Sequence, residues 1–304
     1  MIYTVTLNPS VDYIVEVPTF QLGQLNRIQQ DAKYPGGKGI NVSRVLNRFE
    51  VKTSAFGFVG GWTGSFVEAS LRNEGIKTNF VHIKEDTRIN IKLKTGEETE
   101  INGQGPIINE EEVTDFFEAL SSLNANDWLV IAGSIPASLP NDFYEKITSY
   151  CQERNIQVVI DVSGDYIHSL LQYKPFLLKP NHHELGEWFN VDIDRKEDAV
   201  TYGKKLVKMG AQNVIVSMAG EGALFLNDHV TYYASPPNGK VVNSVGAGDS
   251  VVAGFLSEYT KTKDVKRAFQ YSIASGSATA FSLELCTKAE VEKLLPEVKI
   301  EDWK

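Results

Sequence analysis

The chain has 304 residues and a formal net charge of −9, with 42% hydrophobic and 23% charged residues. This balance is typical of a globular protein that buries a sizeable core without disulfide or metal support. The basic residues are scattered, so no face suited to nucleic acid is expected. No apolar run approaches the roughly 20 residues that span a bilayer, so no membrane partner is expected either.

Cys151 and Cys286 stand far apart and lack the spacing of a metal site. We predict that they are reduced thiols of a cytoplasmic protein. The N-terminal segment MIYTVTLNPSVDY lacks the basic and then apolar pattern of a secretion signal, which favours the same location.

Short apolar, β-branched runs alternate with longer helical patterns. The predicted strands are Ile2–Leu7, Ser54–Val59, Phe80–Ile83, Trp128–Ala132, Val158–Asp161, Phe176–Lys179, Val214–Met218 and Ala223–Leu226. The predicted helices cover residues 39–49, 63–74, 110–123, 141–154, 196–209, 248–260 and 264–281. The strands are apolar throughout, as strands covered on both faces are. The order predicts an α/β fold with a doubly wound, mainly parallel sheet flanked by helices.

Two segments depart from this pattern, at about residues 11–34 and 88–104. Both alternate apolar and polar residues, which is typical of half-exposed antiparallel strands. We expect them to form a small β-sheet lid that projects from the main body and needs a cover on its apolar face. The tail after Thr287 is predicted to hold one short helix and a frayed end.

The clearest functional pattern is NSVGAGDSVVAGF at residues 243–255, where a glycine-rich turn leads into a helix. Small residues let backbone N–H groups approach an anion, and a helix N-terminus adds partial positive charge. The amides of Ala247, Gly248 and Asp249 would suit a transferring phosphoryl group, while Asp249 orients a hydroxyl and accepts its proton. A capping Asp after a glycine turn is the alternative. At a helix N-terminus this carboxylate is expected to be a weak base.

Two other interpretations of the glycines fail on spacing. Val251 stands where the third glycine of a dinucleotide fingerprint belongs, so a dehydrogenase is not expected. Around Lys38, Ala32 occupies the first glycine position of a P-loop and Gly39 follows the lysine.

A second segment, PGGKGINVS at residues 35–43, also places glycines before a predicted helix. Lys38 and Asn41 would lie in its first turns. The exposed backbone would suit sugar hydroxyls, and a flexible strand-to-helix turn is the alternative.

Together, PGGKGINVSRVL and NSVGAGDSVVAGF resemble the signature segments of the PfkB branch of the ribokinase-like carbohydrate kinases, in the same order. TLNPSVD (6–12), FVGG (58–61) and KPNHHEL (179–185) are similar to the 1-phosphofructokinases of that family. The resemblance covers residues 1–304 and implies one ribokinase-like kinase domain that contains the lid. It implies ATP-dependent phosphorylation of fructose 1-phosphate to fructose 1,6-bisphosphate. The alternatives are a tagatose-6-phosphate kinase, or a non-catalytic sugar-phosphate sensor on the same fold.

The same resemblance implies individual site residues. The catalytic positions are Asp249, Gly246, Ala247 and Gly248. The positions that bind the sugar are Asp12, Gly37, Lys38 and Asn41. The phosphate already on the acceptor would be held by Lys38 together with Arg27, Arg88 and Ser134. Taken singly, Asp12 also suits a turn, and Arg27 and Arg88 suit a solvated surface.

ATP and Mg²⁺ are the implied cofactors. Asn181 and Glu184 match the family's N-x-x-E motif, which supports Mg²⁺, often through water. The alternative is a capping Asn with a surface Glu. The positions implied to bind the nucleotide are Ser217, Gly220, Glu221, Gly222 and Gly248, and the segment 217–222 also suits a tight hairpin. A homodimer through the lid is expected by analogy.

Overall fold

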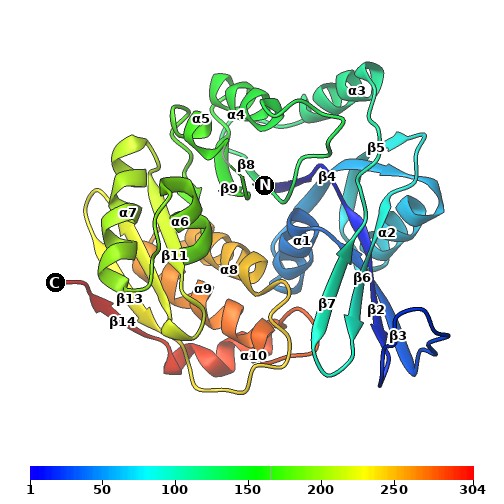
Figure 1. Ribbon diagram of the computed structural model, residues 1–304. Helices are drawn as coiled ribbons and strands as arrows, with labels where there is room; N and C mark the ends of the chain where they lie inside the picture. Colours follow the sequence, from blue (N-terminus) through cyan, green and yellow to red (C-terminus); the bar gives the residue numbers. More distant parts are fainter. Residues whose placement is uncertain (165) are drawn as a thin grey trace.

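The computed structural model describes residues 1–164 and 166–304. Among these residues the central sheet has ten strands in the order β14-β13-β12-β11-β10-β9-β8-β1-β4-β5 (Figure 1). Their bounds are β1 Ile2–Thr6, β4 Thr53–Gly60, β5 Lys77–Ile83, β8 Trp128–Ala132, β9 Gln157–Asp161, β10 Leu177–Leu178, β11 Asn213–Ser217, β12 Ala223–Asn227, β13 Thr231–Ser235 and β14 Lys299–Asp302.

The strands from β11 to β5 pair in parallel, and β12 to β14 extend the sheet in antiparallel fashion. Every residue of β4 and β8 is buried. Side chains alternate between two cores, because Leu129 and Ile131 of β8 face one and Val130 and Ala132 face the other. The predicted doubly wound, mainly parallel sheet is therefore confirmed.

Helices cover both faces of this sheet. One face packs against α1 Lys38–Arg48, α8 Ala247–Thr262, α9 Val265–Ala280 and α10 Lys288–Leu294. The other packs against α3 Glu110–Leu120, α4 Phe143–Glu153, α5 Ile167–Leu171, α6 His182–Phe189 and α7 Lys196–Met209. Helix α2, Gly61–Asn73, packs beside β4 and β5. Among the helices described, none is long and apolar enough to cross a membrane.

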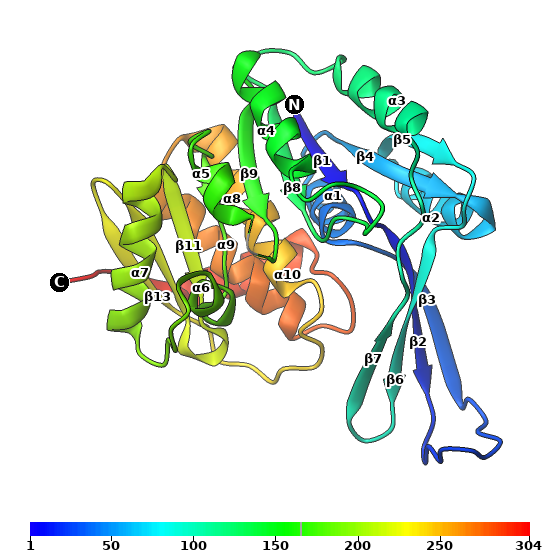
Figure 2. The same ribbon diagram turned by 45° about the horizontal axis from the view of Figure 1, so that its top comes forward.

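A smaller sheet projects from the body (Figure 2). We call it the lid sheet; its strands are β3 Gln30–Gly36, β2 Ser10–Glu16, β6 Arg88–Lys94 and β7 Glu98–Asn102, in that spatial order. Strands β2 and β6 pair in parallel, and the two outer pairs are antiparallel. Strand β3 ends at Gly36 and α1 begins at Lys38, so only Gly37 separates the lid sheet from this helix.

Some elements differ from the sequence-based prediction. The predicted frayed end is wrong: after the expected short helix α10, β14 adds to the sheet edge by pairing with β13. Its sequence, KIED, has one apolar residue, so the pairing depends on backbone hydrogen bonds that no hydrophobic pattern reveals. The elements α5, α6 and β13 also escaped prediction, because short elements carry few periodic residues.

Candidate active site

One large cleft, of about 630 Å³, lies where the lid sheet faces the carboxyl ends of the parallel strands. Ligands of open α/β sheets bind at this edge. Strand ends contribute Asp161 and Ser217, and the lid sheet contributes Asp12 and Arg88. Besides Ser217, Asp12 and Arg88, the predicted site residues in its lining are Gly37, Lys38, Asn41, Ser134, Asn181, Glu184, Gly246, Gly248 and Asp249.

The glycine-rich turn forms the N-terminus of α8. Gly246 caps this helix with φ +77°, a left-handed conformation that favours glycine. The N–H of Ala247 already donates to the Ser244 carbonyl, 3.2 Å away. The N–H groups of Gly248 and Asp249 fall in the first turn, where an α-helix supplies no acceptor of its own. These two amides can therefore bind an anion. A Cβ at position 248 would stand 3.3 Å from Lys179 Nζ, so an ammonium lies beside them.

Asp249 lies in the first turn of α8 and is only 5% exposed. Its Oδ2 accepts a hydrogen bond from Asn41 Nδ2 at 2.8 Å. Burial and then the nearby Asp161 raise the pKa of Asp249 to about 6, against the opposing effects of Lys38, Asn41 and Lys179. The expectation of a weak base is therefore wrong, because desolvation outweighs the helix N-terminus.

Asp161 ends β9 and is fully buried between two lysines. Its Oδ1 lies 3.1 Å from Lys38 Nζ and 3.4 Å from Lys179 Nζ. Burial favours the neutral acid, but Lys179 and Lys38 outweigh it and hold the pKa of Asp161 below its ordinary value. For Lys38, the cost of burial is outweighed by Asp161, Glu184 and Asp249, which raise its pKa. The Lys38 ammonium at the floor of the cleft therefore stays charged, and the Lys179 side chain lies on the other side of Asp161.

The lid side of the cleft is held by hydrogen bonds. Asp12 Oδ1 accepts from Ser10 Oγ at 2.7 Å and from Asn90 Nδ2 at 3.2 Å. The Arg88 guanidinium donates to the Asn8 carbonyl at 3.1 and 3.3 Å and to the Gly103 carbonyl at 3.2 Å. These contacts fix a carboxylate and a guanidinium on the same face of the lid sheet.

Buried polar atoms without partners gather in this cleft. Within residues 1–164 and 166–304 they include Thr6 Oγ1, Asn8 Oδ1 and Asp161 Oδ2, all on residues of its lining. These atoms are therefore available to hydrogen-bond a ligand or a water in the cleft.

Asn181 and Glu184 cap helix α6 reciprocally. Asn181 Oδ1 accepts from the Glu184 amide at 2.8 Å, and Glu184 Oε2 accepts from the Asn181 amide at 2.9 Å. Asn109 and Glu112 form the same box on α3, whose residues are absent from the cleft lining given above. The capping motif alone therefore does not mark a metal site. What distinguishes Glu184 is its place in the cleft, 3.7 Å from Lys38 Nζ.

Of the predicted nucleotide-binding residues in the segment 217–222, one lines the cleft and three lie outside its lining. Ser217 lines the cleft at the end of β11, beside Asn181, with which it forms an isolated parallel bridge. Gly220, Glu221 and Gly222 lie just beyond the cleft, in and after the short 3₁₀ helix Ala219–Glu221 that precedes β12. Their role remains a prediction.

Arg27 lies in the exposed loop between β2 and β3, away from the residues that line the cleft of its own chain. Its predicted role in binding phosphate remains a prediction, which needs either a movement of the lid sheet or a second copy of the chain.

Sequence reasoning missed several residues of the cleft: Asp161, Lys179, Asn8, Asn90 and Lys92. A signal for two of them was present, because Asp161 and Lys179 end predicted strands of the parallel sheet. Polar residues at such ends converge on one edge. Asn90 and Lys92 alternate with Ile89 and Ile91, and only the lid's orientation shows which set faces the cleft.

Comparisons with known proteins agree with this geometry. Residues 5–291 match the model of the pfkB family carbohydrate kinases. The chain is 58% identical to a 1-phosphofructokinase of Bacillus subtilis, over 99% of each chain. It is 34% identical to a D-tagatose-1-phosphate kinase of Bacillus licheniformis, again over 99% of each. The structure of phosphofructokinase-2 from Escherichia coli, in complex with substrates and products, superposes with a TM-score of 0.92 at 28% identity, covering 97% of this chain and 98% of that one. The chain belongs to the pfkB family of carbohydrate kinases.

Proposed function

We propose that the chain transfers the γ-phosphoryl group of ATP to fructose 1-phosphate, giving ADP and fructose 1,6-bisphosphate. The observation that carries this proposal is the meeting of Asp249, the amides of the α8 N-terminus and the polar face of the lid sheet in one cleft. The substrate follows from the 58% identity to a 1-phosphofructokinase, which exceeds the 34% identity to a tagatose-phosphate kinase.

The proposed step is an in-line displacement. The acceptor hydroxyl oxygen bonds to the γ-phosphorus, the bond from that phosphorus to the bridging oxygen of ADP breaks, and Asp249 accepts the hydroxyl proton. The N–H groups of Gly248 and Asp249 would stabilise the charge on the γ-oxygens, with Lys179 beside them. A pKa of about 6 leaves Asp249 mostly ionised at neutral pH and ready to accept a proton.

The acceptor is proposed to lie along the lid sheet. Asp12 would accept hydrogen bonds from sugar hydroxyls, and Arg88 with Ser134 would hold the phosphate already present. Hydrogen bonds hold these side chains in place before the sugar binds. Asn90 donates to Asp12, and Asn8 links the two proposed phosphate ligands, because its carbonyl accepts from Arg88 and its side-chain amide donates to Ser134. We further propose that residues 1–304 act as one kinase domain in which the lid sheet limits access of water to the γ-phosphate.

Mg²⁺ is the proposed metal. Within the described residues, no cluster of three His, Cys, Asp or Glu side chains could hold a metal ion. Mg²⁺ usually keeps several waters and binds through one or two carboxylates and the substrate phosphates, so the proposal needs no such cluster. Asp161 Oδ2 and Glu184 offer carboxylate oxygens at the cleft floor, with Asn181 next to them. When bound, Mg²⁺ would neutralise phosphate charge during transfer.

A homodimer through the lid sheet is also proposed. The cross-strand row Tyr13–Ile91–Ile101 lies on the face opposite Asp12, and Ile101 is 53% exposed. An exposed apolar sheet face is stabilised when another surface covers it, and a second copy of the same face can do so.

We also propose that the protein is cytoplasmic. The basis is its two free, buried cysteines, which suit a reducing compartment.

The test is ADP release measured with ATP and Mg²⁺ over a panel of sugar phosphates. We expect the highest kcat/KM with fructose 1-phosphate, and lower values with fructose 6-phosphate, tagatose 1-phosphate and tagatose 6-phosphate. ADP release independent of every sugar phosphate, or a tenfold preference for a tagatose phosphate, would contradict the proposal.

A further inference from the structure

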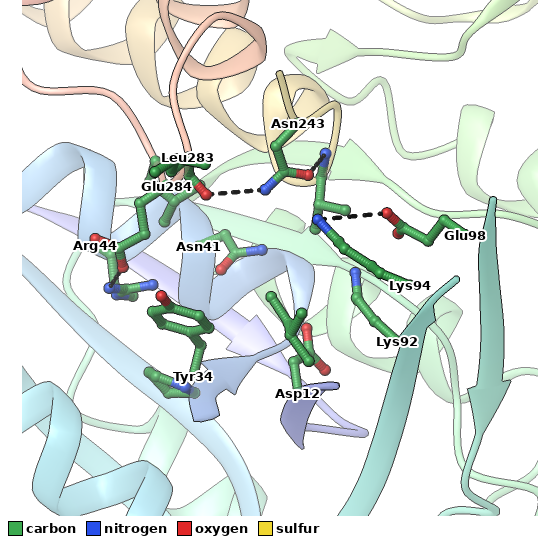
Figure 3. A pocket seen from close by; sticks show the side chains of 14 residues that line it. Asp12, Tyr34, Asn41, Arg44, Lys92, Lys94, Glu98, Asn243, Leu283 and Glu284 are labelled. Carbon is green, nitrogen blue, oxygen red and sulfur yellow. Dashed lines mark hydrogen bonds and ion pairs between the residues drawn. The ribbon is translucent and has the colours of Figure 1, made fainter. Parts of the chain in front are cut away.

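Lys92 is a buried lysine on the cleft face of the lid sheet. It lies on β6 in the alternating set Arg88, Asn90, Lys92 and Lys94, and is only 7% exposed. Two neighbouring hollows share it: the large cleft and a smaller hollow toward Asn243 and Leu283. In Figure 3 its side chain extends from β6 toward the space between Asp12 and Asn41.

The charge of Lys92 is poorly compensated by the protein. Its ion partner is Glu100 on β7, with Nζ and Oε1 3.5 Å apart, and the Glu100 side chain is 48% exposed. Ile14, its cross-strand neighbour on β2, offers no polar atom on its side chain. Burying an ammonium beside one half-solvated carboxylate is costly, so the site is built for a further acceptor.

Lys92 and Arg88 serve different groups. Their backbones are four residues apart on one strand, which corresponds to about 13 Å. Arg88 is turned to the base of the lid sheet, toward the carbonyls of Asn8 and Gly103. A phosphate held by Arg88 and Ser134 would therefore lie at one end of the acceptor, and the other end would lie near Lys92, which lines the cleft with Asp12 and Asn41.

We propose that Lys92 is a specificity-determining residue that donates a hydrogen bond to a hydroxyl of the acceptor sugar, at the end remote from its phosphate. This inference rests on the proposed function. A carboxylate such as Asp12 only accepts hydrogen bonds and a lysine ammonium only donates them, so together the two side chains distinguish the orientations of neighbouring hydroxyls. A ketohexose phosphate with an inverted hydroxyl satisfies one of them and leaves the other unpaired, which discriminates strongly.

The chain offers a matched control in Lys94. It lies on the same strand and face, two residues further on, and is absent from the lining of the large cleft. It pairs with Glu98 at 3.8 Å, and its side chain is 39% exposed. Lys92→Met and Lys94→Met therefore remove the same atoms from a buried site in the large cleft and from a more exposed site that lines only the smaller hollow.

The experiment measures kcat and KM of both variants for ATP, fructose 1-phosphate and tagatose 1-phosphate. For Lys92→Met we expect KM for fructose 1-phosphate to rise at least tenfold, because the substitution removes a hydrogen bond that a charged group donates. The ratio of kcat/KM for fructose 1-phosphate to that for tagatose 1-phosphate should fall by about tenfold. KM for ATP should stay within twofold of the natural chain's value. Lys94→Met should leave all three constants within twofold, and Lys92→Arg should recover most of the preference.

Four results separate the possibilities. An unchanged preference in a Lys92→Met variant with native melting temperature overturns the inference. A rise confined to KM for ATP also overturns it, since Lys92 would then serve the nucleotide. If Lys92→Met does not fold, Lys92→Gln is measured against the same criteria. If the natural chain phosphorylates neither sugar, the proposed function fails. If the natural chain is active and Lys92→Met has the same KM values and sugar preference, only the role of Lys92 is refuted.

Discussion

Asn41 Nδ2 donates a 2.8 Å hydrogen bond to Asp249 Oδ2, and this contact joins the first turns of α1 and α8. The two residues are 208 positions apart in the chain. Asn41 was predicted to bind sugar, and it does line the cleft. The contact adds a second function: it orients the carboxylate and stabilises its ionised form.

The pH dependence of the reaction should report Asp249. Because burial and Asp161 raise its pKa to about 6, kcat/KM should fall tenfold per pH unit as the pH drops below about 6. Asn41→Ala removes a hydrogen bond that lowers this pKa, so the acidic limb should move to higher pH. Asp161→Asn removes a charge that raises it, so the limb should move to lower pH. Rate profiles from pH 4.5 to 8 check both directions, and equal shifts of one sign would contradict this account.

Asp249→Asn should separate catalysis from binding. The amide cannot accept the hydroxyl proton, so we expect kcat to fall by about 10² to 10⁴. Fructose 1-phosphate should still bind, since Asp12 and Arg88 are untouched. Turnover assays and calorimetric titration measure the two effects. A comparable loss of sugar affinity would indicate a structural role for Asp249.

The same substitution should stabilise the fold. Because burial raises the pKa of Asp249 from 3.8 to about 6, the unfolded state ionises first, so stability is lost as the pH rises through this window and stays lower above it. Removing that charge should raise the free energy of unfolding by about 1–3 kcal/mol above pH 6. The gain should shrink as the pH falls from about 6 toward the ordinary pKa of 3.8, and vanish below that value, where Asp249 is protonated in the folded and unfolded states. Urea unfolding at pH 7.5 and 4.5 tests this, and a gain that is equal at both values would rule out a charge effect.

Arg88→Ala should weaken binding of the sugar phosphate alone. Losing a charge-assisted contact costs about 1.5–3 kcal/mol, which corresponds to a rise in KM of roughly 10- to 100-fold. KM for ATP should change little. Arg72→Ala is the matched control, because Arg72 pairs with Glu68 on the exposed surface of α2. If KM for the sugar is unaltered, Arg88 does not bind the phosphate.

Ile101→Glu should disrupt association through the lid sheet. A carboxylate at the centre of an apolar interface would be buried without a partner, so the variant should sediment as a monomer where the natural chain is a dimer. Met209→Glu, at the end of α7 and far from the lid sheet, is the control (Figure 1). A natural chain that is monomeric at all concentrations would refute the proposed dimer.

The sequence predicts those parts of the molecule that depend on local pattern. Glycines before a helical stripe indicate the turns that carry Gly37 and Gly246, and strict alternation indicates the lid strands. The pairing of Asp161 with Lys38 and Lys179 is not local, because it needs β9 and β10 to be neighbours in the sheet and α1 to begin above them.

Burial is equally hidden from the sequence. In the amino-acid sequence alone, Asp249 is a carboxylate at a predicted helix N-terminus, which argues for a low pKa. Only the packed structure shows that desolvation dominates. Lys92 and Lys94 are likewise equivalent in the sequence, yet only Lys92 lines the large cleft.

The short passage from β3 through Gly37 into α1 has a mechanical consequence. A tilt of the lid strands must be absorbed at Gly37 or passed on to Asn41, which donates a hydrogen bond to the Asp249 carboxylate one helical turn later. If the proposed roles hold, binding of the sugar at the lid sheet and alignment of Asp249 depend on the same stretch of backbone. An acceptor that does not bring the lid strands into their closed position would also leave the Asp249 carboxylate wrongly oriented. Selectivity for the sugar and the avoidance of unproductive ATP hydrolysis would then have the same structural cause.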